Sequence, residues 1–333
     1  MIVSLVATNS YLPEKIVPND FFITEGASDD HPMFKGTNLR HHVAENETAV
    51  DMMERASAQL VKDLNLDVKK DIDILLSNVT CLDQPFTGSG AGIAYRLGAD
   101  PAWIIDHQNG GCVSFLYMMD VARALMAGSN AKTALICNVQ NAAGRIFSHP
   151  ENRKLAQSAV PGDGCGVGYL IANDSSPIIT IVKKTYGEFA GDMRMISDDG
   201  KEWWEPRTTP CHVEFTERKI AKVIGRGNRM VTEVMQKALD AVSLKSSDID
   251  FLITNQPNRV FLRNWREALQ MKPEQHIQTF ADHGNLFGAA IPICLTKGVN
   301  DSLIQKDHRL MLAGFSHAGD YAAASIVHWH ANR

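Results

Sequence analysis

Residues 69–78 read KKDIDILLSN, and residues 246–255 read SSDIDFLITN. Each segment follows a stretch with apolar residues at helical spacing, AVDMMERASAQLVKDL (49–64) in the first case and MVTEVMQKALDAV (230–242) in the second. A helix followed by a short apolar run is typical of an α/β unit, because buried strands are short and continuously apolar. The recurrence of this unit at an offset of 177 residues indicates an internal duplication.

Two further echoes follow in the same order. DHQNGGC (106–112) returns as DHGNLFG (282–288), and KTALICNV (132–139) returns as RLMLAGFS (309–316). One short match arises by chance, but three matches in order at nearly one offset favour duplication. We therefore expect two α/β halves, residues 1–173 and 174–333, whose sheets are covered by helices on both faces.

Composition restricts the class of protein. The net charge of −5 argues against a nucleic-acid binder, because phosphate contacts need a basic surface. No apolar run approaches the roughly 18–20 residues of a membrane span. The opening MIVSLVATNSYLPEK has no basic region before its apolar residues, so it predicts a first strand and not a signal peptide. These features indicate a cytoplasmic protein without membrane contact.

The six cysteines are scattered and form no C-x-x-C pair, so we expect neither a metal site nor a disulfide framework. Cys112 differs from the others, because the chain bends through Gly110-Gly111 and delivers this side chain at a predicted helix N-terminus. A helix dipole at that position would stabilise a thiolate and lower the thiol pKa. The residues alone support a nucleophile and a small buried packing residue about equally.

Several segments, in their order along the chain, resemble the ketoacyl-ACP synthase III branch of the thiolase superfamily. They are VATNSYLPEKIVPN (6–19), NLRHHVAENETAVDM (38–52), NGGCVSF (109–115), PGDGCGVGYLI (161–171), NQPN (255–258), DHGNLFGAAIPICL (282–295) and GFSHAGDYAAASIVHW (314–329). The resemblance implies a thiolase-like fold, in which duplicated βαβαβαββ halves form a five-layer α-β-α-β-α sandwich. The first half would carry the nucleophilic cysteine, and the second half the His, Asn and Asp residues of the site.

The resemblance also implies covalent chemistry at Cys112. Its thiolate would take an acyl group from a thioester and hold it as an acyl-enzyme. The backbone N–H groups of Cys112 and of Gly319, in the Ala318-Gly319 loop, would bind the oxyanion. No cofactor is expected, since acyl-phosphopantetheine or acyl-CoA is the substrate.

The sequence departs from the family pattern at one catalytic position. Condensing relatives use a Cys-His-Asn set, and Asn285 matches their asparagine. Asn255 stands where they carry the histidine that supports decarboxylation. An amide donates hydrogen bonds but is neither a cation nor a base at neutral pH, so this change argues against carbon–carbon condensation.

Asp320 stands in a loop where relatives carry glycine or apolar residues, and a carboxylate there needs a partner. We predict a Cys112–His283–Asp320 triad, in which the carboxylate orients the imidazole and the imidazole deprotonates an acceptor. Such a set resembles a small ester-forming subgroup of the family in specialised metabolism. A solvated or helix-capping Asp320 is the alternative, and His317 in the same loop is a second candidate base.

Other residues suggest how substrates bind. Arg259, Arg263 and Arg266 fall on one helical face, which suits either docking of an acidic acyl carrier protein or simple solvation. The tryptophan that stacks on CoA in relatives is missing, which leaves Phe34 and Arg153 as candidate nucleotide or pantetheine contacts. Trp203 and Trp204, adjacent in a polar segment, would either wall an acceptor pocket or cover the core.

We therefore expect an acyltransferase that passes an acyl group from a carrier protein or CoA, through Cys112, to a small alcohol or amine. The alternatives are decarboxylative condensation to a β-keto product and an inactive partner subunit of a condensing enzyme. The resemblance further implies a homodimer, with strand KTALICNV (132–139) at its interface.

Overall fold

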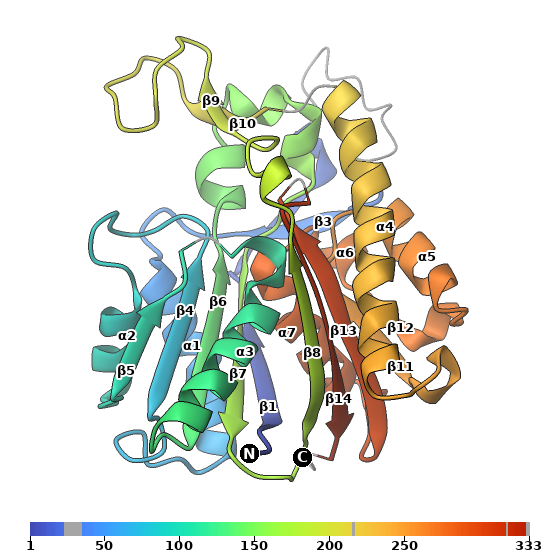
Figure 1. The fold of residues 1–333 in the computed structure, drawn as a ribbon. Coiled ribbons are helices and arrows are strands. Elements are labelled where there is room, and N and C mark those ends of the chain that lie inside the picture. Colours follow the sequence, from blue (N-terminus) through green and yellow to red (C-terminus); the bar gives the residue numbers. More distant parts are fainter. Residues whose placement is uncertain (23–34, 109, 215–216, 318, 331–333) are drawn as a thin grey trace.

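The computed structural model describes residues 1–22, 35–108, 110–214, 217–317 and 319–330. Two mixed five-stranded sheets form its centre (Figure 1). The first sheet has the order β1 (Ser4–Tyr11), β7 (Gly164–Ile171), β6 (Thr133–Gln140), β4 (Ile74–Val79) and β5 (Trp103–Asp106). The second has the order β8 (Ile178–Thr185), β14 (Tyr321–Trp329), β13 (His308–Ser316), β11 (Phe251–Thr254) and β12 (His276–Ile277).

The two sheets repeat one topology. In each sheet, the strand next to one edge pairs in parallel with both of its neighbours, and the remaining pairings are antiparallel. By this pattern β4 in the first sheet corresponds to β11 in the second. Each of these two strands directly follows one of the repeated D-I-D segments, residues 71–73 and 248–250, from which the duplication was predicted. The predicted duplicated α/β architecture is therefore confirmed.

Helices complete five layers around the sheets. Helices α1 (Ala49–Asp63) and α2 (Gly90–Leu97) cover the outer face of the first sheet. Helices α3 (Ser114–Gly128) and α7 (Ala290–Asn300) contact strands of both sheets and so lie between them (Figure 1). Helix α4 (Glu217–Ala241) packs on the outer face of the second sheet, with α5 (Arg259–Ala268) against it and the short α6 (Phe280–His283) nearby.

Local sequence signals set the helix starts. Thr48 caps α1 in a capping box with Asp51, which satisfies two backbone N–H groups that the first turn leaves unpaired. Asn258 caps α5, its Oδ1 accepting from the N–H of Phe261 at 3.0 Å. The apolar stripe of α5 is buried against α4, which leaves the polar stripe of α5 toward solvent.

Two small hairpins lie outside the main sheets. One pairs β2 (Lys15–Pro18) with β3 (Leu39–His42), and the other pairs β9 (Met195–Ser197) with β10 (Cys211–Val213). The β9–β10 hairpin stands above the ends of the sheets (Figure 1). Side-chain amides of Asn152 and Gln157 fix it by donating to the carbonyls of Cys211 and Val213 at 2.8 and 3.1 Å.

Strand β6 lies in the middle of its sheet, between β7 and β4, and is almost wholly buried. The expectation that this strand forms part of a dimer interface is therefore wrong, because both of its edges are already paired. The edge strands of this sheet are β1 and β5. On β5, Trp103 and Ile104 are exposed, and the exposed Phe86 and Tyr95 come from the segment before it. Among the described helices, none is both long and apolar enough to cross a bilayer.

Candidate functional site

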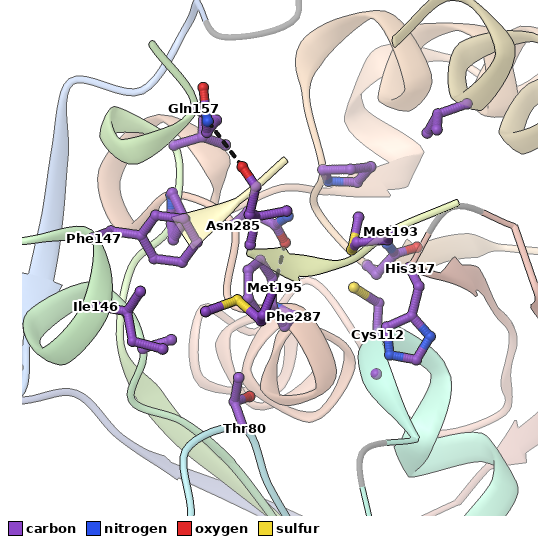
Figure 2. A pocket seen from close by; sticks show the side chains of 18 of the residues that line it. Thr80, Cys112, Ile146, Phe147, Gln157, Met193, Met195, Asn285, Phe287 and His317 are labelled. Atoms are coloured by element: carbon purple, nitrogen blue, oxygen red, sulfur yellow. Dashed lines mark hydrogen bonds between the residues drawn. The ribbon is translucent and has the colours of Figure 1, made fainter. Parts of the chain in front are cut away.

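A cavity of about 290 Å³ opens where the two halves meet (Figure 2). Several strands end at it: Thr80 follows β4, Ala142 follows β6, Asn255 follows β11 and His317 follows β13, and all four residues line its wall. Cys112 lines it from the turn before α3. Strand ends from both halves thus converge on the cavity that Cys112 lines, as is usual for sites in α/β proteins; Cys81, after β4, lines it as well.

The turn that carries Cys112 is fixed from both halves of the chain. Oδ1 of Asn78 accepts from the N–H of Gly110 at 2.8 Å. The hydroxyl of Ser316 donates to the carbonyl of Gly110 at 2.8 Å and accepts from the N–H of Val113 at 3.1 Å. Gly111 has φ +60°, and a Cβ there would lie 2.8 Å from Oγ of Ser316, so only glycine fits.

Cys112 lies in a 3-10 turn, Gly111–Val113, directly before α3. Burial raises the pKa of its thiol to about 12, and a hydrogen bond with the side chain of Asn255 opposes this shift. The nearby carboxylate of Asp320 raises the pKa further. The direction is opposite to the lowered pKa expected from a helix N-terminus, because burial outweighs the Asn255 hydrogen bond and the backbone N–H of Cys112. The resting thiol is therefore protonated at neutral pH, and a reaction as a nucleophile would require a base.

His317 places an imidazole on the cavity wall that also holds Cys112. Its Nδ1 lies 3.0 and 2.9 Å from the two carboxylate oxygens of Asp320. A Cβ added to Gly111 would lie 3.0 Å from Nε2 of His317, so this nitrogen faces the turn that holds Cys112. Figure 2 shows the His317 ring beside Cys112 at the cavity wall. The side chain of Asp320 is only 12% exposed, which strengthens its interaction with the ring.

His283, the histidine expected in the triad, lies elsewhere. It ends α6, its ring centroid is 5.4 Å from that of His41, and it is not among the residues that line the cavity. Its Nδ1 is buried without a hydrogen-bond partner among the described residues, and burial lowers its pKa. The structure therefore pairs Asp320 with His317 instead of His283.

The two asparagines lie as expected, on the cavity wall. Asn255 is almost fully buried, contacts the Cys112 thiol and donates through Nδ2 to the carbonyl of Phe315 at 3.3 Å. Asn285 accepts from the N–H of Phe287 through Oδ1 at 3.1 Å, which fixes the orientation of its amide (Figure 2). Both amides can position a carbonyl group beside Cys112.

The expected second oxyanion donor, Gly319, is already engaged. Its N–H donates to the carbonyl of Ser316 at 2.9 Å, which closes the turn that holds His317. Ala318 lies outside the described residues. The N–H of Cys112 faces its own sulfur and acts to lower the thiol pKa.

The three candidate docking arginines differ in exposure. Arg259 and Arg263 are exposed on α5. The side chain of Arg266 is only 16% exposed, and its Nε is buried without a hydrogen-bond partner among the described residues. Its charge lies close enough to His276 to help lower the pKa of that imidazole. Of the three, only Arg259 and Arg263 therefore have exposed side chains that a carrier protein could contact.

Arg153, one of the two candidate nucleotide contacts, is not brought to the cavity. The guanidinium of Arg153 stacks over the ring of Phe21, 5.1 Å from its centroid, and Arg153 does not line the cavity. Phe34 lies outside the described residues. The arrangement of Arg153 therefore shows a cation–π contact within the protein.

Trp203 and Trp204 are 62% and 65% exposed, and their rings contact each other edge to face. Neither lines the cavity. Residues on either side of the tryptophan segment do line the cavity, because Met193, Met195 and Val213 form part of its apolar wall (Figure 2). Trp203 and Trp204, the predicted acceptor-pocket residues, lie outside this wall.

Two residues of the site were missed in the sequence. Asn78 occupies the same place in the first repeat as Asn255 in the second, and each now lies at one side of the Cys112 turn. The repeat alignment could have identified Asn78. Ser316 had no such signal, because a serine at the end of an apolar strand is common.

Two family models match the chain. The model described as 3-oxoacyl-[acyl-carrier-protein (ACP)] synthase III matches residues 105–187, and the model of the C-terminal part of that enzyme matches residues 239–329. Together they span just over half of the chain. A beta-ketoacyl-[acyl-carrier-protein] synthase III of Clostridium perfringens is 26% identical over 333 residues, which cover 97% of this chain and 98% of that protein. The Neisseria gonorrhoeae enzyme of the same name is 23% identical over 322 residues, with 96% and 97% covered.

Solved structures agree in fold. FabH, the 3-oxoacyl-(acyl carrier protein) synthase III of Pseudomonas aeruginosa, superposes with a TM-score of 0.83 at 20% identity and covers 99% of both chains. Xanthomonas campestris OleA with bound cerulenin superposes with a TM-score of 0.79 at 17% identity and covers 99% of this chain and 98% of that chain. At these identities the superpositions show the fold alone, and they confirm the predicted thiolase-like architecture.

Proposed function

The chain belongs to the 3-oxoacyl-[acyl-carrier-protein] synthase III family of acyltransferases, and from that premise we propose that it transfers an acyl group from Cys112 to an alcohol or amine. His317, held by Asp320, would be the base. The observation that carries this proposal is the His317–Asp320 pair on the wall that also holds Cys112. It revises the predicted triad by exchanging His283 for His317.

In the first step, Nε2 of His317 takes the proton of the Cys112 thiol, whose raised pKa makes a base necessary. The thiolate attacks the carbonyl carbon of the acyl thioester and forms a new carbon–sulfur bond. The carbon–sulfur bond to the donor then breaks, and the donor thiol leaves with the proton from His317. The acyl-enzyme is the product of this step.

In the second step, His317 takes the proton of the acceptor O–H or N–H as that atom attacks the acyl carbon. The Cys112 sulfur leaves, and the proton passes from His317 back to it. The carboxylate of Asp320 keeps the Nδ1 proton in place and stabilises the imidazolium that forms in both steps. An ester or amide is released, and the thiol is restored.

The cavity favours an acyl chain over a polar substrate. Its wall is mostly apolar, with Ile146, Phe147, Met195, Val213 and Phe287 around the space next to Cys112. Burial of a methylene group there would stabilise the bound chain by about 0.8 kcal/mol. The donor is proposed to be an acyl carrier protein docked on Arg259 and Arg263, since such carriers are acidic; acyl-CoA is the alternative donor.

A decarboxylative condensation to a β-keto product is the second candidate. It is favoured by the names of the curated relatives, which are beta-ketoacyl-[acyl-carrier-protein] synthases III. Asn255 and Asn285 would then hold the enolate oxygen that forms when a malonyl thioester loses carbon dioxide. Against it stands Asn255 itself, because its amide carries no positive charge to stabilise that enolate.

We further propose a homodimer that pairs through the open edge of β5, the one edge of the first sheet with exposed apolar side chains in the described part of the chain. Exposed strand edges of this kind readily pair with a second copy.

Intact-protein mass spectrometry tests the proposed function. The protein is incubated with a panel of acyl-carrier proteins and acyl-CoAs, and then with either small alcohols and amines or malonyl-carrier protein. An acyl adduct on the wild type, absent from Cys112→Ala and discharged by an alcohol or amine, is the expected result. Discharge only by the malonyl donor, with release of carbon dioxide, would establish the condensing alternative instead.

A further inference from the structure

A second cluster of reactive side chains lies at the far end of the second sheet. His328 and His330 come from the end of β14, and Asp307 lies just before β13. Each offers one ligand atom, and these atoms lie within 4.8 Å of one another. We propose that Asp307, His328 and His330 form a binding site for a divalent transition-metal ion, and that Zn²⁺ suits its donors.

The backbone places these three side chains together. His328 and His330 are two residues apart in extended chain, so their side chains lie on the same face. Asp307 is brought alongside by the antiparallel pairing of β13 with β14, and its N–H donates to the carbonyl of Trp329 at 2.7 Å. Ser176 fixes the other side: its hydroxyl donates to the carbonyl of His328 at 3.2 Å and accepts from the N–H of His330 at 3.2 Å.

The geometry resembles that of a histidine zinc site. Nε2 of His330 lies 3.1 Å from Nδ1 of His328. Two nitrogens bound tetrahedrally to one zinc at about 2.0–2.1 Å lie about 3.3 Å apart, so little movement is needed. The opposite nitrogen of His330, Nδ1, lies 2.7 Å from Oδ1 of Asp307. A carboxylate in that position orients a metal-binding imidazole, or becomes a ligand itself after a small rotation.

The donor set selects the kind of ion. Two imidazoles and one carboxylate suit zinc and its neighbours, whereas Mg²⁺ and Ca²⁺ prefer oxygen ligands alone. Three protein ligands leave a position for water, which the exposed side chain of Asp307 keeps accessible. A metal ion bound between Nε2 of His330 and Nδ1 of His328 would replace the hydrogen bond that now joins these two nitrogens.

The site is remote from the acyl cavity. Strand β13 leads from His308, next to the cluster, to Ser316 at the Cys112 turn. Its nine residues span about 26 Å at roughly 3.3 Å per step. The ion would therefore act on stability, by tying the end of β14 to the loop before β13, and would leave acyl transfer unchanged. This inference is independent of the proposed function.

Calorimetric titration with Zn²⁺ tests the site. The protein is made without a histidine tag and is treated with a chelator, and the ion used is Zn²⁺ alone. We expect one ion per chain and a rise in Tm of about 2 °C or more when the ion is in excess. His328→Ala with His330→Ala should abolish binding. Asp307→Asn, an exposed and conservative change, should weaken it at least about tenfold.

Matched controls locate the site. His149→Ala changes a histidine beside other carboxylates, and Cys112→Ala removes the thiol of the acyl cavity; both should bind Zn²⁺ as the wild type does. Circular dichroism shows whether the double variant folds, and the Asp307→Asn titration decides the question if it does not. The proposal would be overturned if the wild type did not bind Zn²⁺. It would also be overturned if Asp307→Asn and the folded double variant both bound Zn²⁺ as the wild type does, or if Cys112→Ala lost binding.

Discussion

Nδ1 of His317 lies 2.9 Å from Oδ2 of Asp320 and 3.0 Å from its Oδ1. This contact fixes the tautomer, because the nitrogen that faces a carboxylate carries the proton, and Nε2 is then the basic nitrogen. His317 has φ +47°, a conformation that costs a non-glycine residue about 1 kcal/mol or more. The paired carboxylate and the turn closed by Gly319 hold the ring in this position.

Separate alanine substitutions of His317 and His283 distinguish the roles of the two candidate histidines. His317→Ala should slow acyl transfer by about 10²- to 10⁴-fold, because the general base is lost. His283→Ala, which alters a residue outside the cavity wall, should leave the rate within a few-fold of the wild type once the folded fraction is accounted for. Steady-state transfer with one donor and one acceptor measures both. A large loss in His283→Ala alone would restore the triad predicted from the sequence.

The raised thiol pKa of Cys112 predicts its alkylation profile. A thiol with a pKa of about 12 is protonated at neutral pH, so the rate of reaction with iodoacetamide should rise with pH from 7 to 10 without a plateau. Mass spectrometry of the Cys112 peptide separates this residue from the other five cysteines. A plateau that begins near pH 7 would reveal a resting thiolate, stabilised by a histidinium, and would contradict the need for a base in the first step.

Charge reversal tests carrier docking. Arg259→Glu with Arg263→Glu should slow acylation by a carrier-bound donor about tenfold or more at low salt, and the loss should shrink as salt rises. Acylation by a small synthetic thioester should change little. Lys69→Glu with Lys70→Glu, an equal change of charge on exposed residues of the other half, is the matched control. Equal losses with both donors would point to damage of the cavity.

The dimer prediction rests on the edge of β5. Ile104→Lys places a charge on this exposed edge and should convert a dimer into a monomer in size-exclusion chromatography with light scattering. Ile179→Lys makes the same change at an equally exposed isoleucine on β8, the edge of the second sheet, and should leave the dimer intact. A monomeric wild type at micromolar concentration would end this prediction.

The fold could be predicted because its evidence is repeated in the chain. The two D-I-D segments lead directly into β4 and β11, which hold equivalent positions in two sheets with the same strand order. The position of Cys112 followed from two glycines before a helix, one of which, Gly111, has the positive φ that the turn needs. Local sequence therefore predicted the architecture and the place of Cys112 in the turn before α3.

The partner of Asp320 could not be predicted, because it depends on how loops meet in space. His283 precedes a family motif, but α6 directs it toward His41. His317 is three residues from Asp320, and only the turn closed by Gly319 brings the two side chains together. The direction of the Cys112 pKa was wrong for a related reason: the sequence shows the helix, but burial of the thiol depends on the segments that cover it.

The most direct test of the account is the lifetime of the acyl-enzyme in Asp320→Asn. This substitution removes the charge that orients His317 and stabilises its imidazolium, while Cys112 and the apolar cavity remain. The variant should accept an acyl group on Cys112 but pass it to an alcohol or amine up to about 10⁴-fold more slowly, so that the acyl-enzyme accumulates in intact-protein mass spectra. Discharge of the acyl group at the wild-type rate would contradict the assignment of His317 and Asp320 as the base of the reaction.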